Sequence, residues 1–534
     1  MRKEQFIVWA VLWLTIPLIG HSQEPKPAAM SADSPSDAAP VRRFDIWEYR
    51  VEGNTVLNRQ DVEQAVYPYL GKGKSLQDIE MARNALARRY HDAGYVTVVV
   101  DIPPQKVDNG VVHLRVTEGK VESLVVSGSR YFSLRRIRNG VPALAEGMIP
   151  HLPAANVQLK TLNSKLSDRS IAPVLRPGRA PGTVEVDLKV KDELPLHGSL
   201  DVNDRYSIGT SHLRLSAMLR YDNLWQKEHS LSVQYQGSPE KPSEVKVWSG
   251  TYLARSDESK NILAVYGVSS SSDTATVGTL AVIGNGNIIG ARWIKPLDGA
   301  QDYSHSLTLG VDYKDFKESI VLQGADSLNT PISYMPFVIQ YSGTRHGDSG
   351  TSQYGFGFHF GVRGLQNDPA EFENKRFNAR PNYMFLRASV ERRQRLYRGT
   401  YMRVRLDGQL TDSPLISSEQ YSAGGVDSVR GYHESERLGD DAVHGTLELS
   451  TPSLNRGGLQ ELRALVFVDG AALRVRDHLP GQGSHYELSS AGIGLRLRAW
   501  RYLTATLDWA QVFQATDAVA DGEQRLHFDV ECFF

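Results

Sequence analysis

The sequence contains very few of the features that identify enzymes or disulfide-stabilised secreted domains. Its 534 residues include a single cysteine, Cys532, so no disulfide can form within the chain. It has no G-x-S-x-G nucleophile motif, no glycine-rich phosphate loop, no C-x-x-C and no H-E-x-x-H. Its 15 histidines are scattered, and none stands at metal-ligand spacing in a helical pattern. We therefore expect neither an enzyme nor a protein with a bound metal or cofactor.

An excess of one charge and long apolar runs are also missing. The chain has 60 Lys and Arg against 61 Asp and Glu, which gives no reason to expect a nucleic-acid partner or a highly acidic substrate. Beyond the N-terminal segment there is no apolar run of about 18 residues, so a transmembrane helix is not expected. This pattern is still compatible with a membrane β-barrel, whose lipid face takes only every second residue.

The N-terminal segment has the pattern of a secretory signal. Two basic residues precede an apolar run at Phe6–Ile19, and small residues follow at the positions required for cleavage before Gln23. We therefore predict a signal peptide over residues 1–22; an uncleaved anchor is the alternative, but the apolar run is short for one. Residues 23–42 contain four prolines among alanines and serines, which predicts a disordered linker.

Two similar units of mixed helix and strand are predicted next, over residues 43–119 and 120–194. In the first unit, a short strand precedes helical periodicity and two further strands. The clearest helix begins after Ser75, which forms a capping box with Asp78, and ends at Gly94. Its apolar face comprises Ile79, Ala82, Leu86 and Tyr90.

The second unit repeats this order with weaker signals. A strand at Leu124–Gly128 is followed by a helical stretch at Asn156–Ser167 and a strand at Thr183–Val190. Two units of the order β-α-α-β-β indicate a tandem repeat. A pair of generic small α+β domains is the alternative, because ordinary repeats also recur at this spacing.

From Leu196 onward, helical periodicity disappears and strand-like alternation replaces it. In one segment, Leu386 and Val390 alternate with Arg387 and Glu391. A soluble sandwich would not usually place so many arginines and acids on the second face of successive strands. We therefore predict a mainly β domain, a closed transmembrane antiparallel barrel of 16 strands over residues 195–534. The predicted strands begin near residues 196, 211, 228, 243, 260, 286, 303, 332, 350, 382, 400, 443, 461, 485, 501 and 523.

The connections between these strands alternate in length, as a barrel with short turns at one end requires. The turns at 223–228 and 397–399 are short, whereas long loops are predicted near 316–331, 365–381 and 413–442. Counted along the chain, the last of these is the sixth long loop.

The most specific signal is V-R-G-Y at residues 429–432, inside that sixth loop. A guanidinium stays protonated, so a buried Arg430 requires an acidic partner. On the next strand, alternate residues are apolar, which puts Phe467 and Asp469 together on the opposite, lumen face. Asp469 is therefore a candidate partner for Arg430 in a charge-assisted contact. In the alternative, Arg430 is solvated and Asp469 pairs with an arginine of the same lumen, namely Arg463, Arg496 or Arg498.

V-R-G-Y in a long loop, followed by F-x-D on the next strand, resembles the signature of two-partner secretion transporters (the TpsB class, ShlB/FhaC/HecB type). The resemblance extends from about Phe44 to Phe534. It implies that the two N-terminal units are POTRA domains, and the segment from Gly94 to Gly119 is similar to the first POTRA repeat of such proteins. It also implies that the loop lies inside the barrel as a lock. The lock residues would be Val429, Arg430, Gly431 and Tyr432, with Phe467 and Asp469 as partners on the barrel wall.

The last strand also resembles a feature of outer-membrane barrels. Its apolar residues alternate with His527 and other polar residues, and the sequence ends on an aromatic residue. The resemblance implies a signal for barrel-assembly machinery; a soluble edge strand is the alternative. Its residues would be Phe528, Val530 and Phe534.

The expected function follows from the resemblance: a transporter in the outer membrane of a Gram-negative bacterium, with its POTRA domains in the periplasm. It would capture an unfolded, haemolysin- or adhesin-like partner exoprotein and secrete it through the barrel. Membrane lipid and the barrel-assembly machinery would be further partners. The alternatives are a barrel-assembly insertase of the same superfamily and a passive porin. Many family members carry an N-terminal plug helix, for which the proline-rich residues 23–42 are a poor sequence.

Overall fold

The computed structural model describes residues 43–534 except 108, 257–258, 273, 278–279, 284, 301, 322–326 and 456–457. The predicted signal peptide, the linker and any plug helix within residues 1–42 lie outside the described residues. The chain forms two compact units that meet between Gly119 and Lys120. No helix among the described residues combines the length and apolar character needed to cross a bilayer.

The first unit is a three-stranded sheet covered by two helices. Strand β2 is parallel to the central strand β5, and β4 is antiparallel to it on the other side. The small ladder between β1 and β3 was not predicted from the sequence. The elements are β1 (Phe44–Ile46), β2 (Glu48–Glu52), α1 (Arg59–Val66), η1 (Tyr67–Tyr69), β3 (Gly71–Lys74), α2 (Leu76–Asp92), β4 (Val98–Asp101) and β5 (Val111–Glu118).

Helix α2 confirms the sequence prediction in detail. The backbone N–H and the hydroxyl of Ser75 both donate to Asp78 Oδ2, each at 2.8 Å. These two hydrogen bonds lower the pKa of the Asp78 carboxyl below its usual value. The four apolar residues predicted for its inner face, Ile79, Ala82, Leu86 and Tyr90, are all buried.

The second compact unit begins with a domain of the same topology. Its central strand β8 lies between β6, which is parallel to it, and the antiparallel β7. The weak helical stretch predicted at 156–167 is α4, which begins earlier. Helix α3 completes the predicted order β-α-α-β-β, although its position was not given. The elements are β6 (Lys120–Ser127), α3 (Leu134–Asn139), η2 (Pro142–Leu144), α4 (Leu152–Lys165), β7 (Arg169–Pro177) and β8 (Thr183–Asp192).

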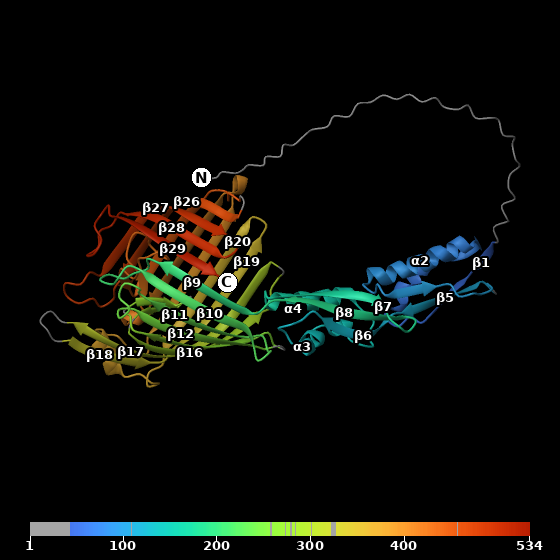
Figure 1. Ribbon diagram of the computed structural model, residues 1–534, viewed down its shortest axis with the longest axis horizontal. Coiled ribbons are helices and arrows are strands. Elements are labelled where there is room, and N and C mark those ends of the chain that lie inside the picture. The colour runs from blue at the N-terminus through green and yellow to red at the C-terminus, as the bar shows by residue number, and fades with distance from the viewer. Residues whose placement is uncertain are drawn as a thin grey trace, which may run out of the picture. The chain divides into compact units, whose positions relative to one another are not determined.

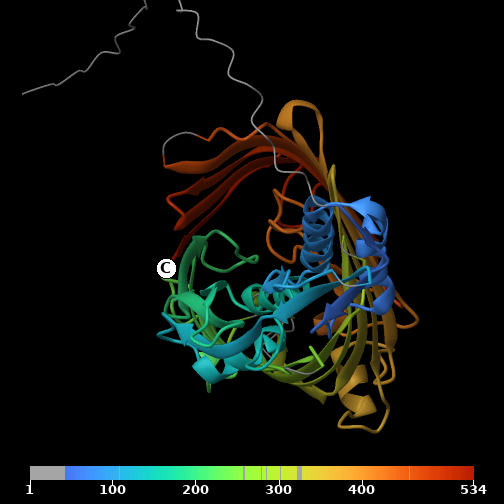
Figure 2. The ribbon, with the colours of Figure 1, turned by 90° about the vertical axis from the view of Figure 1, so that its right-hand side faces the viewer.

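Most of the remaining strands form a closed antiparallel barrel of 16 strands, as predicted (Figures 1 and 2). Strands β18 and β19 pair with successive halves of β17 and together make one stave of the barrel. The strands are β9 (Leu196–Asn203), β10 (Arg214–Leu224), β11 (His229–Gly237), β12 (Lys246–Arg255), β13 (Ile262–Ser270), β16 (Gly286–Leu297), β17 (Tyr303–Val321), β18 (Ser327–Tyr334), β19 (Pro336–Gly347), β20 (Gly350–Gly361), β21 (Met384–Arg395), β22 (Tyr401–Thr411), β25 (Asp441–Ser450), β26 (Leu459–Arg474), β27 (His485–Ala499), β28 (Leu503–Val512) and β29 (Gln524–Phe533).

The long connections differ in part from the prediction. The stretch 316–331, predicted as a loop, is largely strand, because β17 continues to Val321 and β18 begins at Ser327. Two small elements were also missed: the β14 (Thr274–Val277) and β15 (Leu280–Ile283) hairpin, and helix α5 (Pro369–Lys375) in the loop before β21. Alternation of apolar and polar residues alone does not fix where a strand ends.

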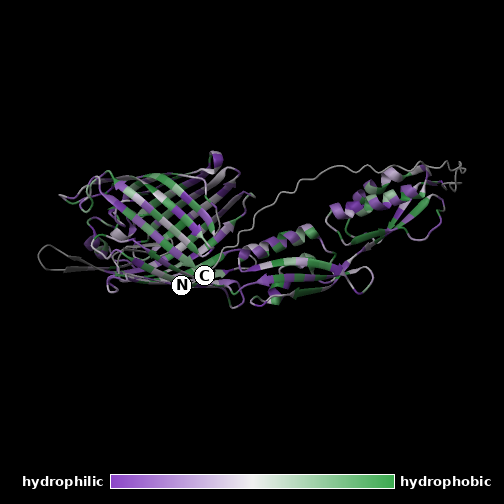
Figure 3. Ribbon diagram, turned by 45° about the horizontal axis from the view of Figure 1, so that its top comes forward, coloured by the Kyte–Doolittle hydropathy of each residue, from purple (hydrophilic) through white to green (hydrophobic). Residues whose placement is uncertain are grey.

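The barrel is apolar outside and polar inside, as the alternation predicts. On β26, Val466 and Val468 are 52% and 56% exposed, whereas Phe467 and Asp469 face the lumen and are 2% and 1% exposed. The alternation of apolar and polar residues along the strands is visible in Figure 3. An apolar outer surface with every strand paired is the arrangement that a lipid bilayer permits.

The barrel closes where β29 pairs with β9. Beyond the ladder, the backbone N–H of Phe534 donates to Gly198 O at 3.0 Å, and that of Gly198 donates to Phe534 O at 3.1 Å. A Cβ on Gly198 would lie 2.0 Å from the Phe534 ring, so the glycine provides the space that the ring occupies. Cys532, two residues earlier, is exposed on the outer surface.

We predict that arginine at Val390 destabilises the barrel, whereas arginine at the adjacent Ser389 is tolerated. Val390 is exposed on the outer face, and Ser389 lies opposite Asp407 on the lumen face. A lipid-facing arginine near the bilayer midplane costs about 2–4 kcal/mol, which a hydrated lumen does not impose. Denaturant unfolding of the two variants in lipid vesicles measures the difference. Equal destabilisation by both substitutions would contradict the assigned faces.

Candidate functional site

The candidate site is the connection between β22 and β25, which folds back into the barrel. We call residues 412–440 loop 6. Its two legs pair through β23 (Tyr421–Ala423) and β24 (Arg437–Gly439). Its orange trace lies within the ring of strands in Figure 2, and its residues contact lumen-facing side chains of the barrel wall. The sequence predicted this loop at 413–442, and the structure confirms its position.

Arg430, near the tip of loop 6, is bound to Asp469 of β26. Its Nε and second terminal nitrogen donate to the two carboxylate oxygens at 2.7 and 2.9 Å, which makes the contact bidentate. The backbone N–H of Arg430 also donates to this carboxylate, at 3.3 Å. The guanidinium lies 3.4 Å from the centroid of the Phe467 ring. The side chains of Arg430 and Asp469 are 4% and 0% exposed, so the pair is shielded from bulk water.

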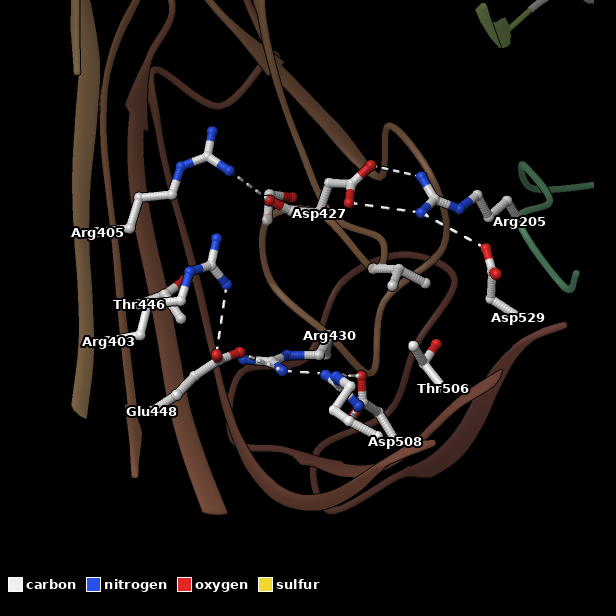
Figure 4. Close-up of a pocket in the computed structure, with 13 residues that line it drawn as sticks. Arg205, Arg403, Arg405, Asp427, Arg430, Thr446, Glu448, Thr506, Asp508 and Asp529 are labelled. Atoms are coloured by element: carbon white, nitrogen blue, oxygen red, sulfur yellow. Dashed lines mark hydrogen bonds and ion pairs between the residues drawn. The ribbon is translucent and has the colours of Figure 1, made fainter. Parts of the chain in front are cut away.

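Arg430 belongs to a larger network of alternating charges (Figure 4). Its remaining terminal nitrogen lies 2.8 Å from Glu448 on β25 and 3.7 Å from Asp508 on β28. Arg403 lies 3.4 Å from Glu448, and Arg496 makes a bidentate contact with Asp508 at 2.7 and 2.9 Å. Glu448 and Asp508 thus each lie between two arginines, which offsets the cost of removing so many charges from water.

The alternative pairing for Asp469 is not observed among the arginines whose partners the structure describes. Arg496 is bound to Asp508, and Arg463 donates to Glu461 at 2.5 Å. The structure therefore places Asp469 opposite Arg430.

The other residues of the V-R-G-Y motif attach the tip to neighbouring strands. Val429 and Tyr432 are fully buried in an apolar cluster with wall residues that include Val512. The Tyr432 hydroxyl donates to Gln514 O at 2.8 Å. Gly431 has a φ of 95°, a conformation that favours glycine. Each residue of the motif therefore has a separate contact with the wall.

Two residues that the sequence did not single out extend these contacts to the closure of the barrel. The backbone N–H of Gly431 donates to His527 Nε2 at 3.0 Å, so this nitrogen is the acceptor. His527 Nδ1 then donates to Asp204 at 3.1 Å. The other oxygen of Asp204 accepts the backbone N–H of Phe528 at 2.7 Å. The alternation of the last strand puts His527 on the lumen face, but nothing in the sequence connects it with a loop nearly a hundred residues away.

A glycine on the adjacent strand supports the aromatic ring beneath Arg430. A Cβ on Gly492 would lie 2.5 Å from the Phe467 ring, so the ring occupies the space that this glycine leaves. Gly492 is opposite Phe467 in the β26–β27 ladder. The wall thus provides a fitted place for the ring as well as an acid for the guanidinium.

The residues predicted as an assembly signal do not join this site. Val530 and Phe534 are exposed on the outer surface, and Phe528 shares their strand face. Their role as a signal stays a prediction.

Comparisons with protein families match both parts of the chain. Residues 44–119 match the POTRA domain of ShlB type. Residues 182–497, more than half of the chain, match the haemolysin secretion/activation protein family ShlB/FhaC/HecB.

Individual relatives are more distant. The outer membrane transporter CdiB of Dickeya dadantii is 26% identical over 182 residues, which is 34% of this chain and 32% of the relative. CdiB of Escherichia coli O6:K15:H31 is 23% identical over 180 residues, 34% of this chain and 30% of the relative. The match therefore spans about a third of the curated relatives' length.

Solved structures share the fold over nearly the whole chain. CdiB from Escherichia coli has a TM-score of 0.60 and 18% identity, covering 94% of this chain and 93% of that one. CdiB from Acinetobacter baumannii has a TM-score of 0.55 and 15% identity, covering 92% and 90%. BamA from Haemophilus ducreyi lacking POTRA domains 1–3 has a TM-score of 0.58 and 14% identity, covering 92% and 100%.

We predict that Asp469→Ala lowers the free energy of unfolding by about 3–5 kcal/mol, because it leaves Arg430 buried without its main partner. The double variant Arg430→Met/Asp469→Leu should lose less, since it removes both charges. Denaturant unfolding of the detergent-solubilised protein checks both. Glu461→Ala is the matched control, because its partner Arg463 lies in a more exposed pair and its loss should cost less than about 1 kcal/mol. A double variant as unstable as Asp469→Ala would contradict the assigned pairing.

Proposed function

Because the chain belongs to the haemolysin secretion/activation protein family ShlB/FhaC/HecB, we propose that it secretes one partner exoprotein through its barrel. The family consists of two-partner secretion transporters of the outer membrane. The proposed substrate is a large haemolysin- or adhesin-like chain that arrives unfolded. The observation that carries this proposal is the anchoring of loop 6 in the lumen by Arg430 and Asp469. A loop held inside by contacts that can be broken suits a pore that must admit a polypeptide.

The proposed path runs from the periplasm to the exterior. The end of the barrel with short turns would face the periplasm, together with two POTRA domains at residues 43–119 and 120–194. The end with long loops would face outward. The lumen supports this proposal, because its paired arginines and acids form a polar wall that an unfolded polar chain can pass without crossing an apolar barrier.

The two small domains would capture the substrate by adding a strand of it to a sheet edge. Such additions use main-chain hydrogen bonds and make modest demands on sequence. In the first domain, β5 lies between β2 and β4 and has no free edge, so the region 111–116 is unsuitable. Strand β4, within the region 94–104, is an edge strand and is the better candidate. In the second domain the corresponding edge strand is β7.

The fold alone does not distinguish secretion from barrel insertion, because BamA shares it at a similar TM-score. The family match over residues 182–497 favours secretion. The lumen loop with V-R-G-Y argues against a passive porin. Membrane lipid and the barrel-assembly machinery are further proposed partners, and the outer face of β29 with Phe528, Val530 and Phe534 is the proposed assembly signal.

We predict that Arg430→Ala abolishes export while the barrel still assembles. The arginine holds the loop, whereas the barrel is held by its strand ladders. Deletion of the gene first identifies the largest exoprotein that disappears from the culture medium. The measurement is then the amount of this exoprotein in the medium of deletion strains that carry each variant. Arg463→Ala is the matched control. Arg463 faces the same lumen, but its carboxylate partner is Glu461 of the same strand, so this variant should retain export.

The outcomes separate the three functions. Loss of one exoprotein on deletion, with other outer-membrane barrels intact, supports secretion. Loss of other barrels supports insertion, and passage of small solutes without protein supports a porin. Unchanged export by Arg430→Ala would remove the role proposed for the loop 6 contact.

A further inference from the structure

Loop 6 consists of two parts with different surroundings. We call residues 412–423 and 437–440 the root and residues 424–436 the tip. The root includes the paired strands β23 and β24, and the tip carries V-R-G-Y. Each part has a buried arginine–carboxylate pair and apolar packing, but their partners differ: the tip is bound to the barrel wall, and the root is bound to other long loops.

The root is held by a buried carboxylate, Asp440, which is 0% exposed. Arg376, from the loop that contains α5, donates to both of its oxygens at 2.7 and 2.6 Å. The backbone N–H of Leu415 donates to it at 2.9 Å, and that of Arg476, from the loop after β26, at 2.7 Å. Arg376 in turn donates to the carbonyl oxygens of Leu415 and Arg476, at 2.5 and 3.0 Å. One carboxylate thus joins both ends of loop 6 to two other long loops.

Apolar packing fixes the same part of the loop. Leu415 and Ile416 are 1% exposed and belong to a cluster with Phe316, Tyr334 and Phe372, which come from β17, β18 and α5. Glu419, also in the root, accepts hydrogen bonds from the Tyr334 hydroxyl at 2.7 Å and from Lys314 at 2.6 Å. Opening the root would therefore break an apolar core and a saturated polar network together.

We call Gly424, Gly425 and Ser435, at the end of the tip next to the root, the neck; all three have a positive φ. Gly424 and Gly425 have φ values of 108° and 97°, and Ser435 on the returning leg has 58°. A Cβ on Gly424 would lie 2.5 Å from Glu436 Cβ and 2.6 Å from His433 O. Gly424 directly follows β23, whereas Gly425 and Ser435 each lie one residue further from the β23–β24 ladder. Changes in backbone angle concentrate at such positions when a segment turns as a body.

The tip also borders a space lined by charged side chains. The tip lies beside a cavity of about 320 Å³, shown in Figure 4. Charged side chains dominate its lining, among them Arg205, Arg403, Arg405, Asp427 and Asp529. Because this cavity is polar, charged groups released from the wall can be solvated there.

We propose that Arg376 and Asp440 are positioning residues that keep the root of loop 6 closed during export. The tip then leaves Asp469 and turns about the neck, while the root remains in place. This inference rests on the proposed export function, because the movement is assigned to the passage of substrate.

The test uses disulfides engineered in the full-length protein with Cys532→Ser, which leaves no native thiol. Ser422 and Leu438 are direct partners in the β23–β24 ladder, and directly opposite residues have Cβ atoms about 4.5–5.5 Å apart. Ser422→Cys/Leu438→Cys should therefore cross-link the root. For the tip, a Cβ at Gly431 lies 3.3 Å from Ala510 Cβ, so Gly431→Cys/Ala510→Cys should fasten the tip to β28.

We expect export with the root cross-linked to stay within about two-fold of its reduced form, and the tip cross-link to reduce export by at least about ten-fold until a reductant is added. Loss of export on cross-linking the root, reversed by the reductant, would overturn the inference. So would unchanged export with the tip cross-linked. If no variant exports protein, Cys532→Ser alone included, the proposed function itself fails. The root pair decides the question even if cysteine at Gly431 impairs the reduced protein.

A third variant tests Arg376 directly. Arg376→Ala should lower export by at least about ten-fold, because it leaves Asp440 buried without its cationic partner. Adding the root disulfide to Arg376→Ala should restore export when oxidised and not when reduced, since a covalent bond then does the work of the arginine. A defect that the disulfide leaves unchanged would show that Arg376 acts in folding rather than in holding the root.

Discussion

The structure depends on one constraint: the Arg430 guanidinium cannot lose its proton, and it is buried. A permanent charge in such a place must have carboxylates around it, and the barrel wall provides them on β25, β26 and β28. The carboxylates on β25 and β28 also pair with Arg403 and Arg496. The requirement of one side chain in a loop therefore determines residues on several strands, and it ties the position of the loop to the barrel.

The hydrogen bonds of the barrel backbone do not depend on these contacts of loop 6. The strand ladders close on themselves through β29 and β9, so the cylinder does not need the loop to stay intact. Contacts between loop and wall can then be used for a conformational purpose. The relay from Gly431 through His527 to Asp204 shows that the tip still touches the place where the cylinder closes. The tip of loop 6 is thus in direct contact with the strand at which the barrel closes.

Much of this architecture is visible in the sequence because it depends on local periodicity. Alternation gives the strands and the lumen face, and the capping box at Ser75 gives the longest helix of the first unit. The pairing of Arg430 with Asp469 was predicted from the V-R-G-Y motif and from the lumen face of β26. The sequence did not predict the contacts of four other residues, namely His527, Asp204, Arg376 and Asp440. Each of them contacts its partner because of strand order and loop packing, which no short sequence pattern encodes. The continuation of β17 to Val321 and its pairing with β18 were missed because alternation alone does not fix where a strand ends.

The Phe467 ring, which fits over Gly492, has a consequence beyond the charges. The Arg430 guanidinium lies over the face of this ring, and the ring occupies space that is free because Gly492 on the neighbouring strand has no side chain. A side chain at that position would meet the backbone oxygen of Trp509 at 2.0 Å and the Phe467 ring at 2.5 Å, so the close approach of both requires glycine there. The place of the ring beneath Arg430 therefore depends on an uncharged residue that a survey of the ionic partners of Arg430 would overlook.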